Sequence, residues 1–155
     1  MLAETKSKGD IAESRCLYEL IKLGYNISIP YGDNCRYDLI VDINNVLLRI
    51  QVKFSSQINN ESLFFTLKSS SNHTTNKHYS VYNGQIDGFL LYHSLTDKVY
   101  VVSIEEVDKQ KSLTLRIQPT KNNQTKGIKI AKDYELNEEN LNELARSKII
   151  SIASL

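Results

Sequence analysis

Residues Tyr37 to Ser56, YDLIVDINNVLLRIQVKFSS, form the stretch that decides the fold. Apolar and polar residues alternate on both sides of Asn44-Asn45, which predicts two antiparallel strands joined by a two-residue hairpin turn. Asparagine suits such a turn because it tolerates positive φ angles. The turn also fixes the pairing of the strands, so that Asp38 faces Gln51.

Side chains alternate between the two faces of a sheet, and the predicted register therefore gathers a polar group on one face. That face carries Asp38, Ile40, Arg49, Gln51 and Lys53, with Val46, Leu48, Ile50, Val52 and Phe54 behind it. An acid, an amide and an ammonium group converge there, and we take this patch as the candidate active site. The alternative is an ordinary ion pair of Asp38 with Arg49 or Lys53 on a solvated sheet face.

The bulk properties are those of one globular domain spanning residues 1–155, with 41% apolar and 24% charged residues. A net charge of +1 gives no general argument for nucleic acid, which would have to be bound by local clusters. No apolar run approaches the ~20 residues that span a bilayer, so no membrane partner is expected. The N-terminal residues show no hydrophobic signal region, and Cys16 and Cys35 are far apart in the sequence. These features predict a cytoplasmic protein with reduced thiols.

A helix is predicted from Gly9 to Leu23, where apolar residues recur at three- and four-residue steps and Gly24 is a natural stop. Glu13 precedes Cys16 by three residues and therefore lies on or beside the apolar face. A carboxylate at that place either binds a cation or remains at the solvated boundary of the helix.

The remaining pattern predicts an α+β fold that has a mixed central sheet, an N-terminal helix and a C-terminal helix. The region from Ser69 to Asn76 is polar and without periodicity, which indicates a loop. Further strands are predicted at Asn26–Ile29, Ser62–Leu67, Asp87–Tyr92, Lys98–Ser103 and Leu113–Ile117, a short helical turn at Ile104–Asp108, and the closing helix at Asn137–Lys148.

Hydrolysis of a phosphodiester is the chemistry that this set of residues suits. A divalent ion orients water and neutralises phosphate, and Mg²⁺ prefers oxygen ligands. Asp38 supplies a carboxylate, Gln51 an amide oxygen and Val52 a backbone carbonyl, while Glu13 would supply a second carboxylate from the helix. Lys53 would stabilise charge at the scissile phosphate, or help to deprotonate the attacking water.

Other residues give weaker signals. His73 and His78 lack the accompanying cysteines or carboxylates of a zinc site. His93 is expected to be structural, and Tyr92 and Tyr100 to be core or sheet-edge residues rather than platforms for stacked bases.

Three blocks, GDIAE (Gly9–Glu13), YDLIVD (Tyr37–Asp42) and RIQVKFSS (Arg49–Ser56), resemble the PD-(D/E)XK nuclease superfamily. Two later stretches, Gln85–Val107 and Leu115–Glu135, extend the resemblance to the branch that contains a cyanobacterial group I intron homing endonuclease. The resemblance covers the chain from about Lys6 to about Glu135.

The resemblance implies a restriction-endonuclease-like α/β core, cleavage of double-stranded DNA with Mg²⁺ (Mn²⁺ as a substitute), and a homotetramer. By position, Glu13 would be the helix acid, Asp38 the central metal ligand and Lys53 the conserved lysine of the motif. Gln51 stands where an acid is commoner, although this branch accepts glutamine. This change weakens metal binding or marks an inactive relative. Tyr37 replaces the proline that gives the motif its first letter.

DNA contacts are expected from lysines in or beside polar loops, and a solvated loop is the alternative for each of them: Lys68, Lys77, Lys121, Lys126 and Lys129. Two other functions remain open besides intron homing. One is another nuclease of the superfamily, either of the restriction type or resolving Holliday junctions. The other is a catalytically inactive relative that binds DNA.

Overall fold

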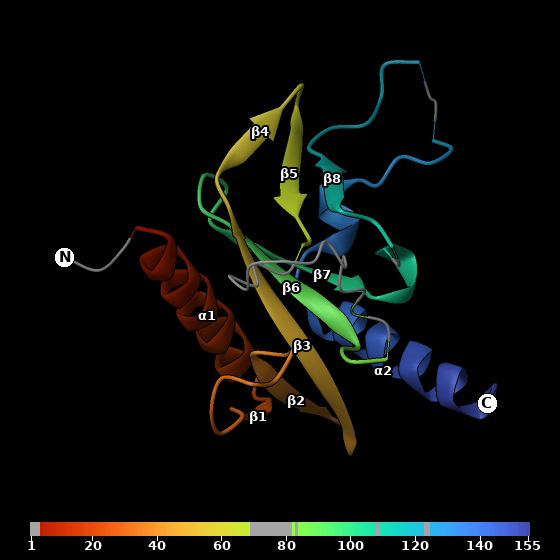
Figure 1. The fold of residues 1–155 in the computed structure, drawn as a ribbon. Coiled ribbons are helices and arrows are strands. Elements are labelled where there is room, and N and C mark those ends of the chain that lie inside the picture. The colour runs from red at the N-terminus through yellow and green to blue at the C-terminus, as the bar shows by residue number, and fades with distance from the viewer. Residues whose placement is uncertain (1–3, 69–81, 83, 108, 123–124) are drawn as a thin grey trace, which may run out of the picture.

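The structure is a computed structural model that describes residues 4–68, 82, 84–107, 109–122 and 125–155 (Figure 1). In chain order its elements are α1 (Glu4–Lys22), β1 (Asn26–Ser28), β2 (Leu39–Ile43), β3 (Val46–Ser55), β4 (Gln57–Asn59), β5 (Ser62–Thr66), β6 (Gly88–His93), β7 (Lys98–Ser103), a 3₁₀ turn η1 (Glu105–Val107), β8 (Ser112–Arg116), a second turn η2 (Ala131–Tyr134) and α2 (Glu138–Ala153).

The central sheet has the strand order β1-β2-β3-β6-β7. Every neighbouring pair in it is antiparallel except β3 and β6, which run parallel. The predicted α+β fold, with a mixed central sheet, an N-terminal helix and a C-terminal helix, is thus confirmed. A smaller antiparallel sheet, β4-β5-β8, lies beside it.

The hairpin between β2 and β3 forms as the sequence predicts. Asn44 and Asn45 both have positive φ, 53° and 67°, as a two-residue turn between twisted strands requires. Val41 pairs with Leu48, and both side chains are fully buried. The pairing of the two strands therefore places alternate residues in the core and leaves the others on the candidate face.

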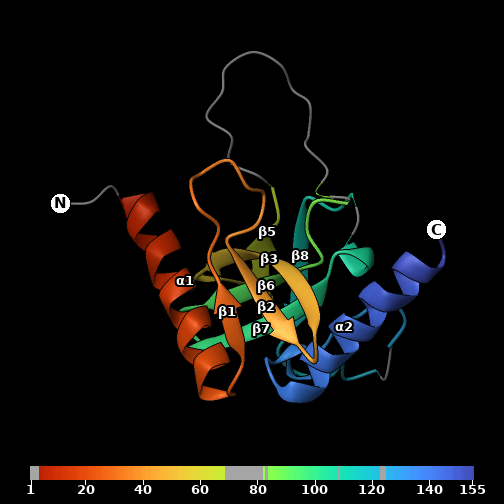
Figure 2. The ribbon, with the colours of Figure 1, turned by 90° about the horizontal axis from the view of Figure 1, so that it is seen from below.

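The core has two parts, one on each face of the central sheet. Apolar residues of α1 and α2, among them Cys16, Leu20 and Leu144, pack with Val41 and Ile50 on one face. Figure 2 shows the two helices on opposite flanks of the β2–β3 hairpin. On the other face the smaller sheet packs its inward side chains against β6 and β7, through Leu63, Phe65, Leu113, Leu115, Phe89, Leu91, Tyr100 and Val102.

Strands β6 and β7 are buried on both faces, which their lack of alternation predicts. All six residues of β6 are buried. His93 lies fully inside, where its Nε2 is 3.1 Å from the carbonyl oxygen of Gln57. Tyr92 and Tyr100 are buried as well, so the structural interpretation of these three side chains is confirmed.

Most predicted strand ends are within one residue of the observed ones, whereas both helices extend about one turn further than predicted. The first helix begins at Glu4 rather than at Gly9, and the last helix continues beyond Lys148 to Ala153. Strand β4 was not predicted, although it pairs with β5 across a local turn at Asn60 and Glu61, which both have positive φ. The smaller sheet was not predicted either, because local periodicity does not reveal that β5 pairs with β8, far along the chain. The predicted loop at Ser69–Asn76 lies outside the described residues. Within the described part of the chain, no helix is long and apolar enough to cross a bilayer.

Candidate active site

Asp38 lies directly before β2 and is held by two neutral donors. The backbone N–H of Val52 donates to Asp38 Oδ2 over 2.7 Å, and Gln51 Nε2 donates to the same oxygen over 2.6 Å. The N–H of Asp38 donates to the carbonyl of Ile50 at 2.8 Å. The predicted approach of Asp38 to Gln51 is therefore present, and the backbone of both strands fixes it.

The surroundings of Asp38 favour its protonated form. Burial raises the pKa of Asp38, although the hydrogen bonds from Val52 and Gln51 and the charge of Lys53 act against that shift. The alternative of a solvated ion pair with Arg49 is wrong, because Arg49 pairs with Asp87. The carboxyl group of Asp38 is thus partly desolvated and is bound by neutral donors.

Lys53 lies two residues beyond Gln51 on the same strand. Its Nζ donates a hydrogen bond of 2.9 Å to the carbonyl of Lys68 and lies 5.9 Å from the centre of the Tyr82 ring. Burial lowers the pKa of Lys53, and the negative charge of Asp38 only partly offsets this effect. The ammonium group is thus held close to the acid in a poorly solvated place.

Glu13 is brought toward Asp38 by α1, whose Ala12 and Cys16 are buried against the central sheet. The residue itself remains exposed, yet partial burial of its carboxyl and the charges of Asp38 and then Asp10 raise its pKa. None of the described residues forms a hydrogen bond or an ion pair with this carboxylate. The structure therefore joins Glu13 electrostatically to the hairpin, which the helical pattern alone could not decide.

The available oxygen donors fit a hard divalent cation better than zinc. Nowhere among the described residues do three His, Cys, Asp or Glu side chains gather in a group that could hold a metal. Asp38 binds the amide of Gln51, which also approaches the backbone carbonyl of Val52, and the second carboxylate, that of Glu13, is close enough to Asp38 for their charges to interact. Mg²⁺ is usually bound in this way, by one or two carboxylates with water and substrate phosphate completing its shell. His73 and His78 lie outside the described residues.

The amide of Gln51 presents its nitrogen to this group. Besides Asp38, Nε2 approaches the carbonyl oxygen of Val52 at 3.3 Å. Rotation of the amide about its last side-chain bond exchanges nitrogen and oxygen, so the same side chain can serve either as a donor to Asp38 or as a neutral oxygen ligand.

The lysines expected to contact DNA fall into separate places. The carbonyl of Lys68 accepts the bond from Lys53, so this residue borders the site. Lys121 and Lys126 are exposed in the segment between β8 and η2. Lys129 is paired with Glu106 at 2.9 Å and with the hydroxyl of Tyr134 at 3.1 Å. Lys77 lies outside the described residues.

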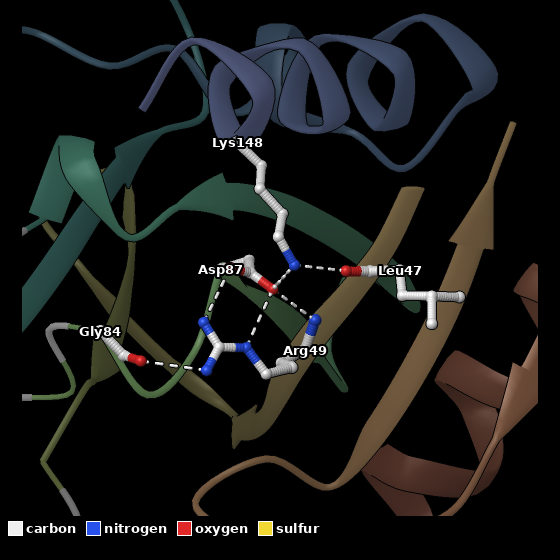
Figure 3. Close-up of polar contacts among 5 residues, drawn as sticks. All are labelled: Leu47, Arg49, Gly84, Asp87 and Lys148. Carbon is white, nitrogen blue, oxygen red and sulfur yellow. Dashed lines mark hydrogen bonds and ion pairs between the residues drawn. The ribbon is translucent and has the colours of Figure 1, made fainter. Parts of the chain in front are cut away.

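Sequence reasoning missed a cluster of charges around Asp87 (Figure 3). Arg49 of β3 and Lys148 of α2 both bind this carboxylate, with nitrogen–oxygen distances of 3.1 Å and 3.0 Å. Burial disfavours ionised Asp87, but the hydrogen bonds from Arg49 and Lys148 outweigh it and lower the pKa. An acid directly before a fully buried strand was the signal in the sequence, since such a charge needs a partner.

Comparison with known proteins agrees with this geometry. The family model of the PD-(D/E)XK endonuclease matches residues 3–137. The chain belongs to this family. Among solved structures, one match is a bacterial homing endonuclease, I-Ssp6803I, at 18% sequence identity and a TM-score of 0.68, covering 99% of this chain and 100% of that chain. No curated protein matches the sequence.

Family membership accounts for the architecture around the site. The matched region contains α1, the hairpin and the strands β6 to β8. At the identity found, the likeness to I-Ssp6803I shows that the fold is shared. The chain is thus a PD-(D/E)XK nuclease domain, and the roles of its individual side chains are part of the proposal below.

Proposed function

We propose that this protein is a Mg²⁺-dependent, site-specific endonuclease of double-stranded DNA that acts as a group I intron homing enzyme. The observation that carries the proposal is the meeting of Asp38, directly before β2, with Gln51 and Lys53 of the middle strand β3, together with the charge interaction between Glu13 and Asp38. Family membership supports the nuclease activity, and the shared fold of a bacterial homing endonuclease supports the biological role.

Asp38 and Glu13 would hold the metal, with Gln51 and the carbonyl of Val52 as neutral ligands. When bound, a divalent ion supplies charge neutralisation at the phosphate and orients water for attack. The raised pKa values of both acids support this role, because each carboxylate gains from a cation what it lacks in solvation. Mn²⁺ should serve in place of Mg²⁺, since both accept oxygen ligands.

Lys53 would act on the scissile phosphate through its ammonium group. A lysine whose pKa is lowered by burial can stabilise negative charge or share a proton at neutral pH. Its hydrogen bond to the carbonyl of Lys68 directs the ammonium group, so the residue needs no large movement to stay near the acid.

A plasmid nicking assay tests the enzyme. Wild-type protein should nick or linearise DNA with Mg²⁺ or Mn²⁺, while Asp38→Ala and Lys53→Ala should lose more than about 100-fold in rate. Asp133→Ala and Lys98→Ala, at exposed positions away from the site, are the matched controls. Failure of the wild type to cleave with either metal would leave a DNA-binding relative, which a mobility-shift assay would then detect.

The choice of substrate separates homing from other activities of the superfamily. Cleavage of an allele without the intron at one position supports homing, whereas preferential cleavage of a four-way junction supports a resolving enzyme. Light scattering tests the proposed homotetramer, which should have about four times the 17.7 kDa mass of one chain. Replacement of a lysine that contacts DNA phosphates should reduce both the affinity for DNA and the dependence of that affinity on salt. The lysines to be replaced one at a time are Lys68, Lys77, Lys121, Lys126 and Lys129.

A further inference from the structure

The charge cluster around Asp87 is not needed to hold the metal or the phosphate in the mechanism above, yet it is buried and joined by several hydrogen bonds. The side chain of Asp87 is only 9% exposed. Its carboxylate accepts four hydrogen bonds: from Arg49 N at 2.7 Å, Nε at 3.3 Å and Nη2 at 3.1 Å, and from Lys148 Nζ at 3.0 Å. Figure 3 shows the guanidinium group and the ammonium group converging on it from two elements.

Arg49 and Asp87 join β3 to β6 where the parallel pairing begins. The N–H of Asp87 donates to the carbonyl of Arg49 at 2.8 Å, while the Arg49 N–H donates back to the Asp87 carboxylate. The strand register that follows pairs Ile50 with Gly88 and Gln51 with Phe89. The bonds between Arg49 and Asp87 therefore lie at the start of the β3–β6 pairing that continues along Gln51 and Lys53.

The same arginine also reaches the turn before β6. Its Nη1 donates to the carbonyl of Gly84 at 3.0 Å. Two residues earlier in the chain, the ring of Tyr82 lies beneath the ammonium group of Lys53. Arg49, which lies on the same strand as Lys53, thus binds both Asp87 and the turn close to the ring under that lysine.

We propose that Arg49 and Asp87 are positioning residues of the active site, which tie the turn beneath Lys53 and the start of β6 to the part of β3 that carries Gln51 and Lys53. The inference rests on the proposed function. It concerns the geometry of the site, which can be measured without any cleavage.

The N–H of Val52 provides that measurement, because its hydrogen bond ends on Asp38 itself. In Arg49→Lys and Asp87→Asn, hydrogen exchange at Val52 should accelerate about tenfold relative to exchange at Leu90 in the buried strand β6. Lysine keeps the charge of Arg49 but cannot bind both carboxylate oxygens and Gly84 together. Asparagine keeps the shape of Asp87 without its charge. If Asp87→Asn fails to fold, Asp87→Glu takes its place in the experiment.

Arg116→Gln is the matched control. Arg116 also binds a carboxylate and a backbone carbonyl, those of Glu61 and Gln118, but it lies on β8 in the smaller sheet. Its side chain is 28% exposed, compared with 34% for Arg49. Its replacement should leave exchange at Val52 unchanged.

Single-turnover cleavage gives the second measurement. Arg49→Lys and Asp87→Asn should lower the rate about 10- to 100-fold, while DNA affinity with Ca²⁺ stays within about twofold of the wild type. Unchanged exchange at Val52 in both variants overturns the inference, and so does an equal loss of rate in Arg116→Gln. If wild-type protein cleaves nothing, the proposed function fails, and the exchange ratio still decides whether the pair positions the site.

Discussion

Gln51 and Val52 donate hydrogen bonds to the same oxygen of Asp38, at 2.6 and 2.7 Å. Where an acid is commoner, this chain therefore has an amide that stabilises the carboxylate beside it. A second carboxylate at that distance would repel the first and raise its pKa further. Compared with an acid at the same position, Gln51 makes the metal-free site more stable but offers a metal one anionic ligand fewer.

Replacement of Gln51 by Glu should reverse this balance. Without metal, we expect Gln51→Glu to melt about 2–4 °C lower than the wild type. When Mg²⁺ is added, the melting temperature of Gln51→Glu should rise more than that of the wild type. Thermal denaturation without Mg²⁺ and with about 10 mM Mg²⁺, enough to saturate a weak site, checks both effects. Gln118→Glu, at an exposed position, is the control. Equal gains in Gln51→Glu and wild type would show that residue 51 does not contact the metal.

Asp38→Asn should separate stability from activity. The folded pKa of Asp38 is raised, so the folded state binds more protons than the unfolded state above about pH 4, and wild-type stability falls as pH rises through this range. Asparagine can still accept the bond from Val52. We expect the variant to lose this pH dependence and to be at least as stable as wild type at pH 7.

Urea denaturation between pH 4 and pH 8, roughly the range in which the acid ionises, checks the Asp38→Asn prediction when it is done without metal. Cleavage should fall more than about 100-fold in the same variant. A variant less stable than wild type at every pH would contradict the proposed desolvation of Asp38.

Lys53→Met should also stabilise the metal-free protein. Burial lowers the folded pKa of Lys53, so its charge opposes folding at neutral pH, and wild-type stability should rise as the pH passes the folded pKa toward about 10.4. Methionine fills a similar volume without charge, and the variant should lose this rise together with cleavage. Chemical denaturation at pH 7 and pH 10, about the ends of that range, measures it.

Lys98→Met is the comparison for Lys53. Lys98 is half exposed and pairs with Glu135, which raises its pKa rather than lowering it. Its replacement should leave stability at pH 7 unchanged or slightly reduced and leave cleavage intact. If Lys53→Met were the less stable of the two at pH 7, the ammonium group of Lys53 would not be desolvated.

The hairpin turn gives a prediction that is independent of catalysis. Asn45 has a φ of 67°, which glycine adopts without strain and a β-branched residue adopts at a cost. Asn45→Val should lower the free energy of unfolding by about 1–2 kcal/mol, whereas Asn45→Gly should change it by less than about 0.5 kcal/mol. The midpoints of urea denaturation of the two variants measure these changes. Equal midpoints for Asn45→Val and Asn45→Gly would exclude strain at this turn.

Much of the site follows from local rules, and some of it does not. A two-residue turn leaves one pairing for the strands on either side, so the local sequence is enough to place Asp38 beside Gln51. Arg49 was placed on the same face, but its partner was not predicted. Asp87 lies far along the chain, and local periodicity gives the face of a residue without giving the element that packs on it.

Helix boundaries and the smaller sheet show the same limit. Helix α2 continues past its predicted end at Lys148 to Ala153 because no glycine or proline stops the helix there. The pairing of β5 with β8 joins segments that are far apart in the sequence, and closing that distance depends on which apolar faces meet.

The sequence by itself determined the hairpin, its register and the convergence of Asp38 with Gln51, because a period of two and a two-residue turn are local properties. Only the tertiary structure decided that Glu13 lies beside Asp38 and that Arg49 binds Asp87 rather than Asp38. Both depend on how α1 and β6 pack against β3, and that packing is set by the burial of whole apolar faces rather than by the order of residues within one element.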